Sequence, residues 1–127
     1  MTDSTLNGPI LIVEDEWLIG DMVQTMLQEA GYDTIGPSAS VADARSLIDE
    51  FSPAFVVLDI NLGAEQSFAI VDLLTARGVG YVLVSGYGSA DLPSAYRHCP
   101  LVEKPLTSDG LISTVRRLIG NHQRVDC

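Results

Sequence analysis

The sequence predicts a single α/β domain built around a doubly wound parallel sheet. The first observation is length, because 127 residues lie in the usual range of one domain. The second is order: short apolar runs alternate with stretches of helical periodicity along the chain, without internal repeats or Ser/Gly-rich linkers. The third is a composition of 46% hydrophobic and 19% charged residues, typical of a globular protein. This alternation favours right-handed crossovers, with helices on both faces of the sheet.

The first predicted strand is the apolar run Ile10–Val13, which follows Pro9. A continuous, largely β-branched run is typical of a central parallel strand that is buried on both faces. The first helix is predicted from Trp17 onward, because apolar residues recur at spacings of three and four, and Gly31 provides its left-handed end. The apolar stripe consists of Ile19, Met22, Val23, Met26, Leu27 and Ala30.

A weaker second strand is predicted over residues 32–35, followed by a second helix. Ser40 and Asp43, three residues apart, resemble a capping box at the start of this helix. We expect one apolar face of the helix to point into the core. This face consists of Val41, Ala44, Leu47, Ile48 and Phe51.

A third strand is predicted over residues 54–58, after Pro53, and a fourth over residues 81–84. The helix between them is closed by Gly78, since glycine readily adopts the left-handed conformation of a helix end. The apolar residues of this third helix are Phe68, Ile70, Val71, Leu73 and Leu74.

The last part of the chain predicts a weak helix, a brief strand and a strong helix. Residues 85–93 are rich in Gly and Ser and end in proline, so any fourth helix should be short and mobile. A brief fifth strand is predicted at residues 101–102, and Thr107 or Ser108 caps a final helix that ends at Gly120. The sequence thus predicts five strands and about five helices. The final helix buries Leu111, Ile112, Val115, Leu118 and Ile119.

Charge and apolar run length exclude several classes of protein. The net charge of -10 repels nucleic acid phosphates and anionic membrane surfaces, so we expect neither as a partner. The longest apolar runs are far too short to cross a bilayer, and the polar start of the chain lacks the basic region of a signal peptide. We expect a cytoplasmic protein.

Cys99 and Cys127 have no second pair of ligands at metal-binding spacing, so we expect neither a zinc site nor a disulfide.

Polar side chains follow four of the predicted strands where each strand ends. In a doubly wound sheet the functional crevice lies outside these carboxyl ends, so we expect the side chains to converge. Taken singly, each has an ordinary structural explanation as a helix cap, a turn residue or a solvated charge. Their occurrence after four different strands favours a shared site. They are Glu14, Asp15 and Glu16 after the first strand, Asp59 and Asn61 after the third, Ser85 after the fourth and Lys104 after the fifth.

These residue types predict a metal-assisted phosphoryl-transfer site. Three carboxylates within roughly 5 Å repel one another by about 3 kcal/mol per pair at an effective dielectric near 20, so the cluster needs a cation. Ligands that are all oxygen, with no His or Cys, favour Mg²⁺. Lys104, the only lysine of the chain, can bind a phosphoryl oxygen, and Ser85 supplies a hydroxyl donor. Asp59 is the candidate carboxylate for covalent chemistry.

In this order and spacing, four motifs resemble the receiver domain of two-component response regulators, over about residues 8–120. The resemblance implies a flavodoxin-like fold with five parallel strands in the order 2-1-3-4-5, counted along the chain. The motifs are Ile-Val-Glu-Asp-Glu at 12–16, Val-Leu-Asp-Ile-Asn-Leu at 57–62, Leu-Val-Ser-Gly-Tyr at 83–87 and Glu-Lys-Pro-Leu at 103–106.

The resemblance also implies a role for each site residue, position by position. The implied cofactor is Mg²⁺, with Mn²⁺ as the alternative ion, and the Lys104–Pro105 peptide is implied to be cis. The implied roles are phosphoacceptor for Asp59, acidic pair at the metal for Glu14 and Asp15, metal-binding backbone carbonyl for Asn61, switch hydroxyl for Ser85 and phosphate-binding lysine for Lys104.

Two positions depart from the common receiver pattern. Glu14 is one methylene longer than aspartate, which should still permit a water-mediated metal contact. Leu101 stands where many receivers carry a switching Tyr or Phe, so we expect Tyr87 to be the switch aromatic instead. Residues 83–88 are similar to a receiver subgroup of alphaproteobacteria marked by Phe-Ala-Thr-Gly-Tyr, although only Gly86 and Tyr87 match it letter for letter.

The resulting hypothesis is a stand-alone receiver and signalling domain, not an enzyme. A sensor histidine kinase or a histidine phosphotransfer protein would phosphorylate Asp59, and residues 121–127 would form a short tail with no output domain. The signal would then leave through the protein surface to an unidentified downstream protein. One alternative is a phosphohydrolase of the haloacid dehalogenase type, although Asn61 replaces the second aspartate that its general acid step requires. The other is an adaptor that functions without phosphorylation.

Overall fold

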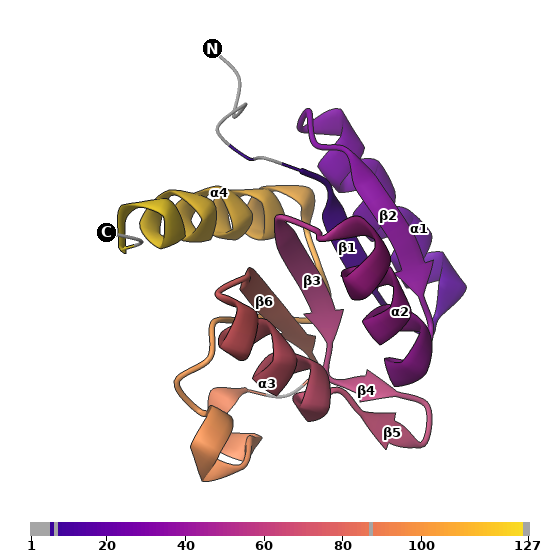
Figure 1. Cartoon of the computed structure of the whole chain (residues 1–127), viewed down its shortest axis with the longest axis vertical. Coiled ribbons are helices and arrows are strands. Elements are labelled where there is room, and N and C mark those ends of the chain that lie inside the picture. Colours follow the sequence, from indigo (N-terminus) through magenta and orange to yellow (C-terminus); the bar gives the residue numbers. More distant parts are fainter. Residues whose placement is uncertain (1–5, 7, 87, 126–127) are drawn as a thin grey trace.

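The computed structural model describes residues 6, 8–86 and 88–125. Its centre is a parallel sheet with the strand order β2-β1-β3-β6-β7, which confirms the predicted order 2-1-3-4-5 (Figure 1). Each pair of neighbouring strands in this sheet is parallel. The strands are β1 (Ile10–Val13), β2 (Thr34–Ser38), β3 (Phe55–Asp59), β6 (Gly80–Ser85) and β7 (Leu101–Glu103).

Helices cover both faces of the sheet, as predicted (Figure 1). Side chains of β1 alternate between the two faces: Leu11 and Val13 pack with α2 and α3, and Ile10 and Ile12 pack with α1 and α4. Both sets are buried, so β1 is the central strand that its continuous apolar run predicts. The described part of the chain has four α-helices: α1 (Trp17–Glu29), α2 (Val41–Phe51), α3 (Phe68–Arg77) and α4 (Ser108–Val125).

The helix ends confirm three of the predicted signals. Ser40 Oγ accepts the Asp43 backbone N–H at 3.1 Å and so caps α2. Gly31 and Gly78 follow α1 and α3 with φ values of 99° and 70°, the left-handed conformation expected of them. For α4 the capping residue is Thr107, whose Oγ1 accepts the Gly110 N–H at 3.0 Å.

Three predictions about the elements are wrong in detail. The second strand begins at Thr34, two residues later than predicted. Phe51 is 48% exposed, because it is the last residue of α2 and the chain turns left-handed directly after it. The last helix continues through Gly120 to Val125, since Gly120 has no positive φ to end it. The helix expected between β6 and β7 is short, as predicted, and takes the form of two 3-10 helices, η1 (Ser89–Asp91) and η2 (Ser94–Tyr96).

The exposure of Phe51 can be tested against a buried residue of the same helix. Ile48 is 1% exposed, so Ile48→Ala should lower the free energy of unfolding by about 2–5 kcal/mol. Phe51→Ala should lower it by less than about 1 kcal/mol, because little apolar surface is lost from the core. Urea unfolding of both variants measures the difference. Equal losses would mean that Phe51 packs into the core.

A hairpin that the sequence analysis did not predict follows β3 (Figure 1). Its antiparallel strands are β4 (Asn61–Leu62) and β5 (Glu65–Gln66), joined by a two-residue turn. The first turn residue, Gly63, has φ 64°, which glycine adopts without steric cost. The hairpin returns the chain to the carboxyl end of β3, where α3 begins.

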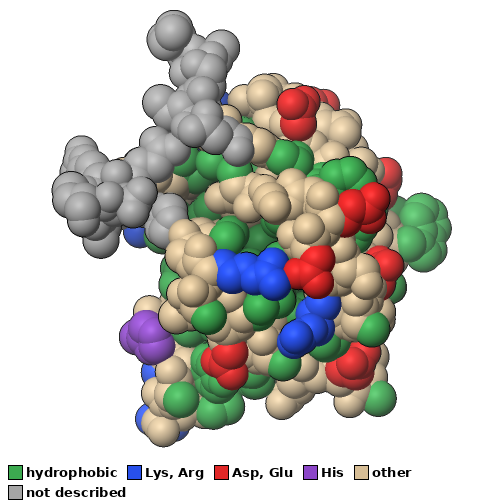
Figure 2. All heavy atoms as spheres, in the orientation of Figure 1, with side chains coloured by type: hydrophobic (Ala, Val, Ile, Leu, Met, Phe, Trp, Pro, Cys, Tyr) green, Lys and Arg blue, Asp and Glu red, His purple; other side chains and the backbone are tan. Residues whose placement is uncertain are grey.

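The surface shown in Figure 2 carries acidic side chains at several separate places. The described basic side chains on this face are fewer and form no continuous patch.

No helix in the described part of the chain combines the length and the apolar character that a bilayer crossing requires.

Candidate functional site

The predicted site residues meet at one edge of the sheet. Glu14 and Asp15 directly follow β1, Asp59 ends β3, Ser85 ends β6, and Lys104 directly follows β7. Because these strands are parallel, their carboxyl ends open onto the same crevice. The register places Asp59 opposite Val84, one residue before Ser85, so the Asp59 carboxylate and the Ser85 hydroxyl belong to neighbouring strands.

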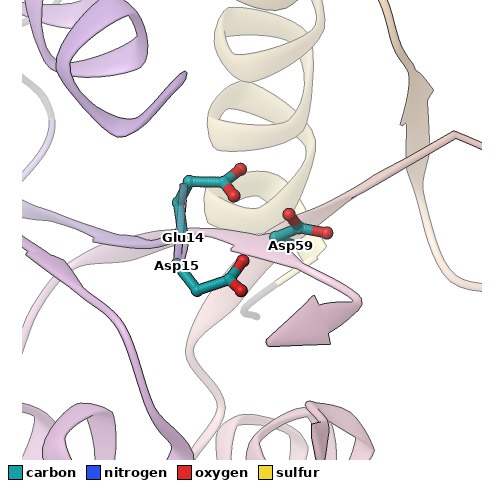
Figure 3. A group of neighbouring side chains, drawn as sticks. All are labelled: Glu14, Asp15 and Asp59. Carbon is teal, nitrogen blue, oxygen red and sulfur yellow. The ribbon is translucent and has the colours of Figure 1, made fainter. Parts of the chain in front are cut away.

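The centre of the site is a cluster of three carboxylates from Glu14, Asp15 and Asp59. One carboxylate oxygen from each lies within 4.8 Å of the others, and the side chains of Glu14 and Asp15 extend toward Asp59 (Figure 3). Glu14 and Asp59 are buried at 4% exposure each, whereas Asp15 is exposed. The cluster is therefore shielded on one side and open to solvent beside Asp15.

The environment of Glu14 disfavours its charged form. Burial, followed by the hydrogen bond and the charge of Asp59, raises the pKa of Glu14 to about 8. Two contacts act in the opposite direction: the Glu16 backbone N–H donates to Glu14 Oε2 at 3.1 Å, and Lys104 contributes its positive charge. These two contacts do not offset the effect of burial on the pKa of Glu14. A further cation would therefore be needed to keep all three carboxylates ionised.

Lys104 is the fixed cation of the site. Its Nζ lies 3.0 Å from Asp59 Oδ2, 3.7 Å from Glu14 Oε1 and 4.0 Å from Glu16 Oε1. Burial lowers the pKa of Lys104, but the hydrogen bond to Asp59 and the three acidic charges outweigh burial and raise it above its usual value. The backbone supports this placement, because the Lys104 N–H donates to the Ser85 carbonyl at 2.7 Å and the Lys104–Pro105 peptide is cis, as predicted.

A pocket of about 280 Å³ lies beside the carboxyl ends of β3 and β6. Asn61, Phe68, Ser85 and Leu92 line it together with neighbouring residues. Ser85 is buried, and the Asn61 backbone N–H donates to Asp59 Oδ1 at 3.1 Å. The two Asp59 oxygens therefore have different partners, an amide at Oδ1 and an ammonium at Oδ2, which orient the carboxylate.

The arrangement agrees with most of the sequence-based interpretation of the site. Asp15 does not cap α1, whose N-cap is Glu16 without a side-chain capping bond, so its carboxylate remains with the cluster. Leu101 is half-buried and packs against the core. Tyr87, the predicted switch aromatic, lies outside the described residues.

Two contacts of the site were not predicted from the sequence. Glu16 contacts Lys104, and Ser67 Oγ donates to the backbone carbonyl of Asp59 at 2.8 Å. The dipeptide Gly63-Ala64 could have indicated the second contact. A glycine at the first position of a two-residue loop is typical of a tight hairpin, and a hairpin here brings Ser67 back to the end of β3.

Trp17 provides a test of ion binding at the cluster. It is the only tryptophan of the chain, and with Glu14 and Asp15 it lines a second pocket of about 290 Å³. A divalent ion at the carboxylates should change the field at the indole, so Trp17 fluorescence should change during a Mg²⁺ titration at constant ionic strength. Asp15→Asn should shift the titration to higher Mg²⁺, by about tenfold or more. Unchanged fluorescence at millimolar Mg²⁺ would contradict ion binding here.

The fold and sequence of the chain are similar to those of solved receiver domains. The chain is 32% identical to SdrG from Sphingomonas melonis Fr1, over 88% of this chain and 96% of that one, with a TM-score of 0.77. SdrG from Pseudomonas melonis Fr1, also 32% identical, has been solved in a BeF3-activated conformation. The receiver domain of NtrX from Brucella abortus is 28% identical over 87% of this chain and 98% of that domain, with a TM-score of 0.78.

Curated proteins with similar sequences are named as transcriptional regulatory proteins. The chain is 28% identical to the uncharacterized transcriptional regulatory protein YbdJ of Bacillus subtilis (strain 168), over 89% of this chain and 51% of YbdJ. It spans about half the length of the curated relatives it matches. No protein-family model matches the chain. On the evidence of its strand order, its acidic site and its similarity to SdrG and to the NtrX receiver domain, the chain belongs to the receiver domains of two-component response regulators.

Proposed function

We propose that this receiver domain takes a phosphoryl group onto Asp59 from the phosphohistidine of a sensor histidine kinase or a histidine phosphotransfer protein. The observation that carries the proposal is the 3.0 Å contact between Lys104 Nζ and Asp59 Oδ2, beside two further carboxylates. A carboxylate that accepts a phosphoryl group needs a fixed cation close by, because the transferred oxygens carry negative charge. Lys104 satisfies this requirement.

The donor set beside Asp59 fits a magnesium ion, with Mn²⁺ as the alternative. Carboxylate oxygens of Glu14, Asp15 and Asp59 lie close enough to share one ion, and we propose the backbone carbonyl of Asn61 as a further ligand. When bound, the ion would neutralise the carboxylates and polarise the phosphoryl oxygens. Oxygen-only ligands favour this hard ion over zinc or copper.

In the proposed reaction, an Asp59 carboxylate oxygen attacks phosphorus in line with the bond to the donor nitrogen. The new O–P bond forms as the N–P bond breaks, and the electron pair of that bond remains on the ring, which leaves as neutral imidazole because its other nitrogen carries a proton. Lys104 Nζ binds one phosphoryl oxygen, and the Ser85 hydroxyl donates to another. The domain thereby promotes its own phosphorylation and later hydrolysis, and acts as a signalling domain without turnover of other substrates.

We propose Ser85 and Tyr87 as the switch residues. The phosphoryl group adds charge and acceptor oxygens at Asp59, which draw the Ser85 hydroxyl inward and shift the segment that follows β6. The BeF3-activated conformation of SdrG supports such a change, since BeF3 has the shape and charge of a phosphoryl group. On this proposal, residues 8–120 form the receiver unit, which passes its signal in the cytoplasm through its own surface to a downstream protein.

Incubation with Mg²⁺ and acetyl phosphate, followed by intact mass measurement, tests the proposal. We expect the mass of one phosphoryl group to be added with Mg²⁺ and no adduct in excess chelator, because the carboxylates otherwise repel the incoming group. An equal adduct in chelator would contradict the role of the ion. A protein that never forms an adduct would be an adaptor, and one that releases phosphate from phosphate monoesters would be a hydrolase.

A further inference from the structure

Ser67 lies between the hairpin and α3, beside the phosphoacceptor strand. It is fully buried and is the N-cap residue of α3, but its side chain makes no capping hydrogen bond. Its backbone has φ -92° and ψ 14°, outside the extended region in which an N-cap serine normally caps a helix. Ser40, the N-cap of α2, is extended and caps its helix in the usual way. The Ser67 hydroxyl therefore has a different partner from the one its position predicts.

That partner is the backbone of Asp59. Ser67 Oγ donates to the Asp59 carbonyl at 2.8 Å, and the Ser67 N–H donates to the Ile60 carbonyl at 2.9 Å. One residue thus binds two consecutive carbonyls and closes the loop that contains the hairpin. Asn61, the proposed carbonyl ligand, lies within this closed loop.

The Ser67 contact completes the hydrogen bonding of the Asp59–Ile60 peptide where the sheet ends. On the β6 side, the Ile60 N–H donates to the Val84 carbonyl at 3.1 Å. On the β1 side, the paired register stops at Leu58, so no β1 residue is paired with Asp59. The Ser67 hydroxyl supplies the hydrogen bond on that side, and the peptide is bound on both sides.

We infer that Ser67 is a positioning residue for phosphoryl transfer, acting through the Asp59 peptide and not by contact with the phosphoryl group. The inference rests on the proposed function of Asp59. Rotation of the Asp59–Ile60 peptide would move the carboxylate away from Lys104 and would also move the Asn61 carbonyl. Partners that orient a metal-ligating group commonly change affinity or activity by about 10–100-fold when removed. The Ser67 hydroxyl limits this rotation.

Ser67→Ala and Ser40→Ala form a matched pair, because both replace a serine at a helix N-cap. We expect Ser67→Ala to slow phosphorylation by acetyl phosphate about tenfold and to weaken Mg²⁺ binding, followed by Trp17 fluorescence, by a similar factor. Ser40→Ala should lose stability but keep wild-type values of the phosphorylation rate and of Mg²⁺ binding, since its hydroxyl caps α2 at the Asp43 N–H and does not bind the Asp59 peptide. Ser67→Thr, which retains the hydroxyl, should restore much of the rate that Ser67→Ala loses.

A third measurement does not depend on metal or phosphorylation. Amide hydrogen exchange in metal-free protein should be faster at Ile60 in Ser67→Ala than in wild type, and unchanged there in Ser40→Ala. The role of Ser67 would be overturned if Ser67→Ala had the phosphorylation rate, the Mg²⁺ affinity and the Ile60 exchange rate of the wild type. If wild-type protein takes no phosphoryl group, the proposed function fails, whereas faster Ile60 exchange and weaker Mg²⁺ binding in Ser67→Ala would still support positioning of the Asp59 peptide.

Discussion

Asp59→Asn is expected to abolish the phosphoadduct completely while leaving the fold intact. The amide of asparagine lacks the nucleophilic carboxylate oxygen on which the proposed transfer depends. The variant should fold, because asparagine has nearly the same volume as aspartate and adds no charge to the buried cluster. Lys104 Nζ keeps a second acidic partner, Glu14 Oε1, at 3.7 Å. Intact mass after incubation with Mg²⁺ and acetyl phosphate measures the loss, and circular dichroism checks the fold.

The matched control is Asp49→Asn, which also removes one aspartate charge. Asp49 lies on the surface with its side chain 64% exposed and pairs with Arg77 at 2.7 Å, away from the cluster. This variant should form the adduct as wild type does. An adduct that persists in Asp59→Asn would assign the phosphoacceptor to another carboxylate.

Lys104→Ala is expected to slow phosphorylation of Asp59 by about 10²-fold, the loss typical of removing one charge-stabilising donor from a reaction site. The ammonium contacts Asp59 Oδ2 at 3.0 Å and is the only lysine Nζ in the chain. Any adduct that does form lacks its charge partner, so the variant should also lose the gain in partner affinity that phosphorylation produces. Time courses of intact mass measure the rate. An unchanged rate, or an unchanged switch in partner affinity, would contradict the role assigned to Lys104.

The same variant should have a pH-dependent effect on stability in metal-free protein. Because folding raises the pKa of Lys104, its contacts stabilise the fold fully below the unfolded pKa near 10.5 and lose that effect as the pH rises through the folded value. At pH 7 we therefore expect Lys104→Ala to lower the free energy of unfolding by about 1.5–3 kcal/mol. Mg²⁺ should restore part of this loss, since it supplies positive charge to the same carboxylates. Arg77→Ala is the control, because an exposed ion pair contributes less than about 1 kcal/mol.

The five strands of the main sheet followed from the sequence to within two residues at their starts, because they depend on local patterns, whereas their order was implied by the resemblance to receiver domains. Ile10–Val13 is apolar at every position, and only a strand covered on both faces buries all four side chains. Gly31 and Gly78 were recognised as helix ends, yet the same reasoning was wrong for Gly120, which has helical backbone within α4. Glycine permits a left-handed end without requiring one, so tertiary packing decides whether the helix continues.

Side-chain burial near the end of an element was also decided by tertiary structure. Phe51 has the correct helical spacing for the core face of α2, but it is the last residue of the helix, where the chain already turns away. The hairpin after β3 shows the same limit, since two strands of two residues each carry almost no periodic signal.

For the candidate site, the sequence by itself determined which residue types follow each strand, and the parallel topology was enough to predict that they meet. Only the tertiary structure decided how they meet: that Lys104 binds Asp59 directly, that Glu14 is buried and Asp15 open to solvent, and that the Ser67 hydroxyl binds the Asp59 backbone. The physical reason is that strands and helices follow from local pattern, whereas hydrogen bonds and burial depend on ångström-scale distances between segments far apart in the sequence.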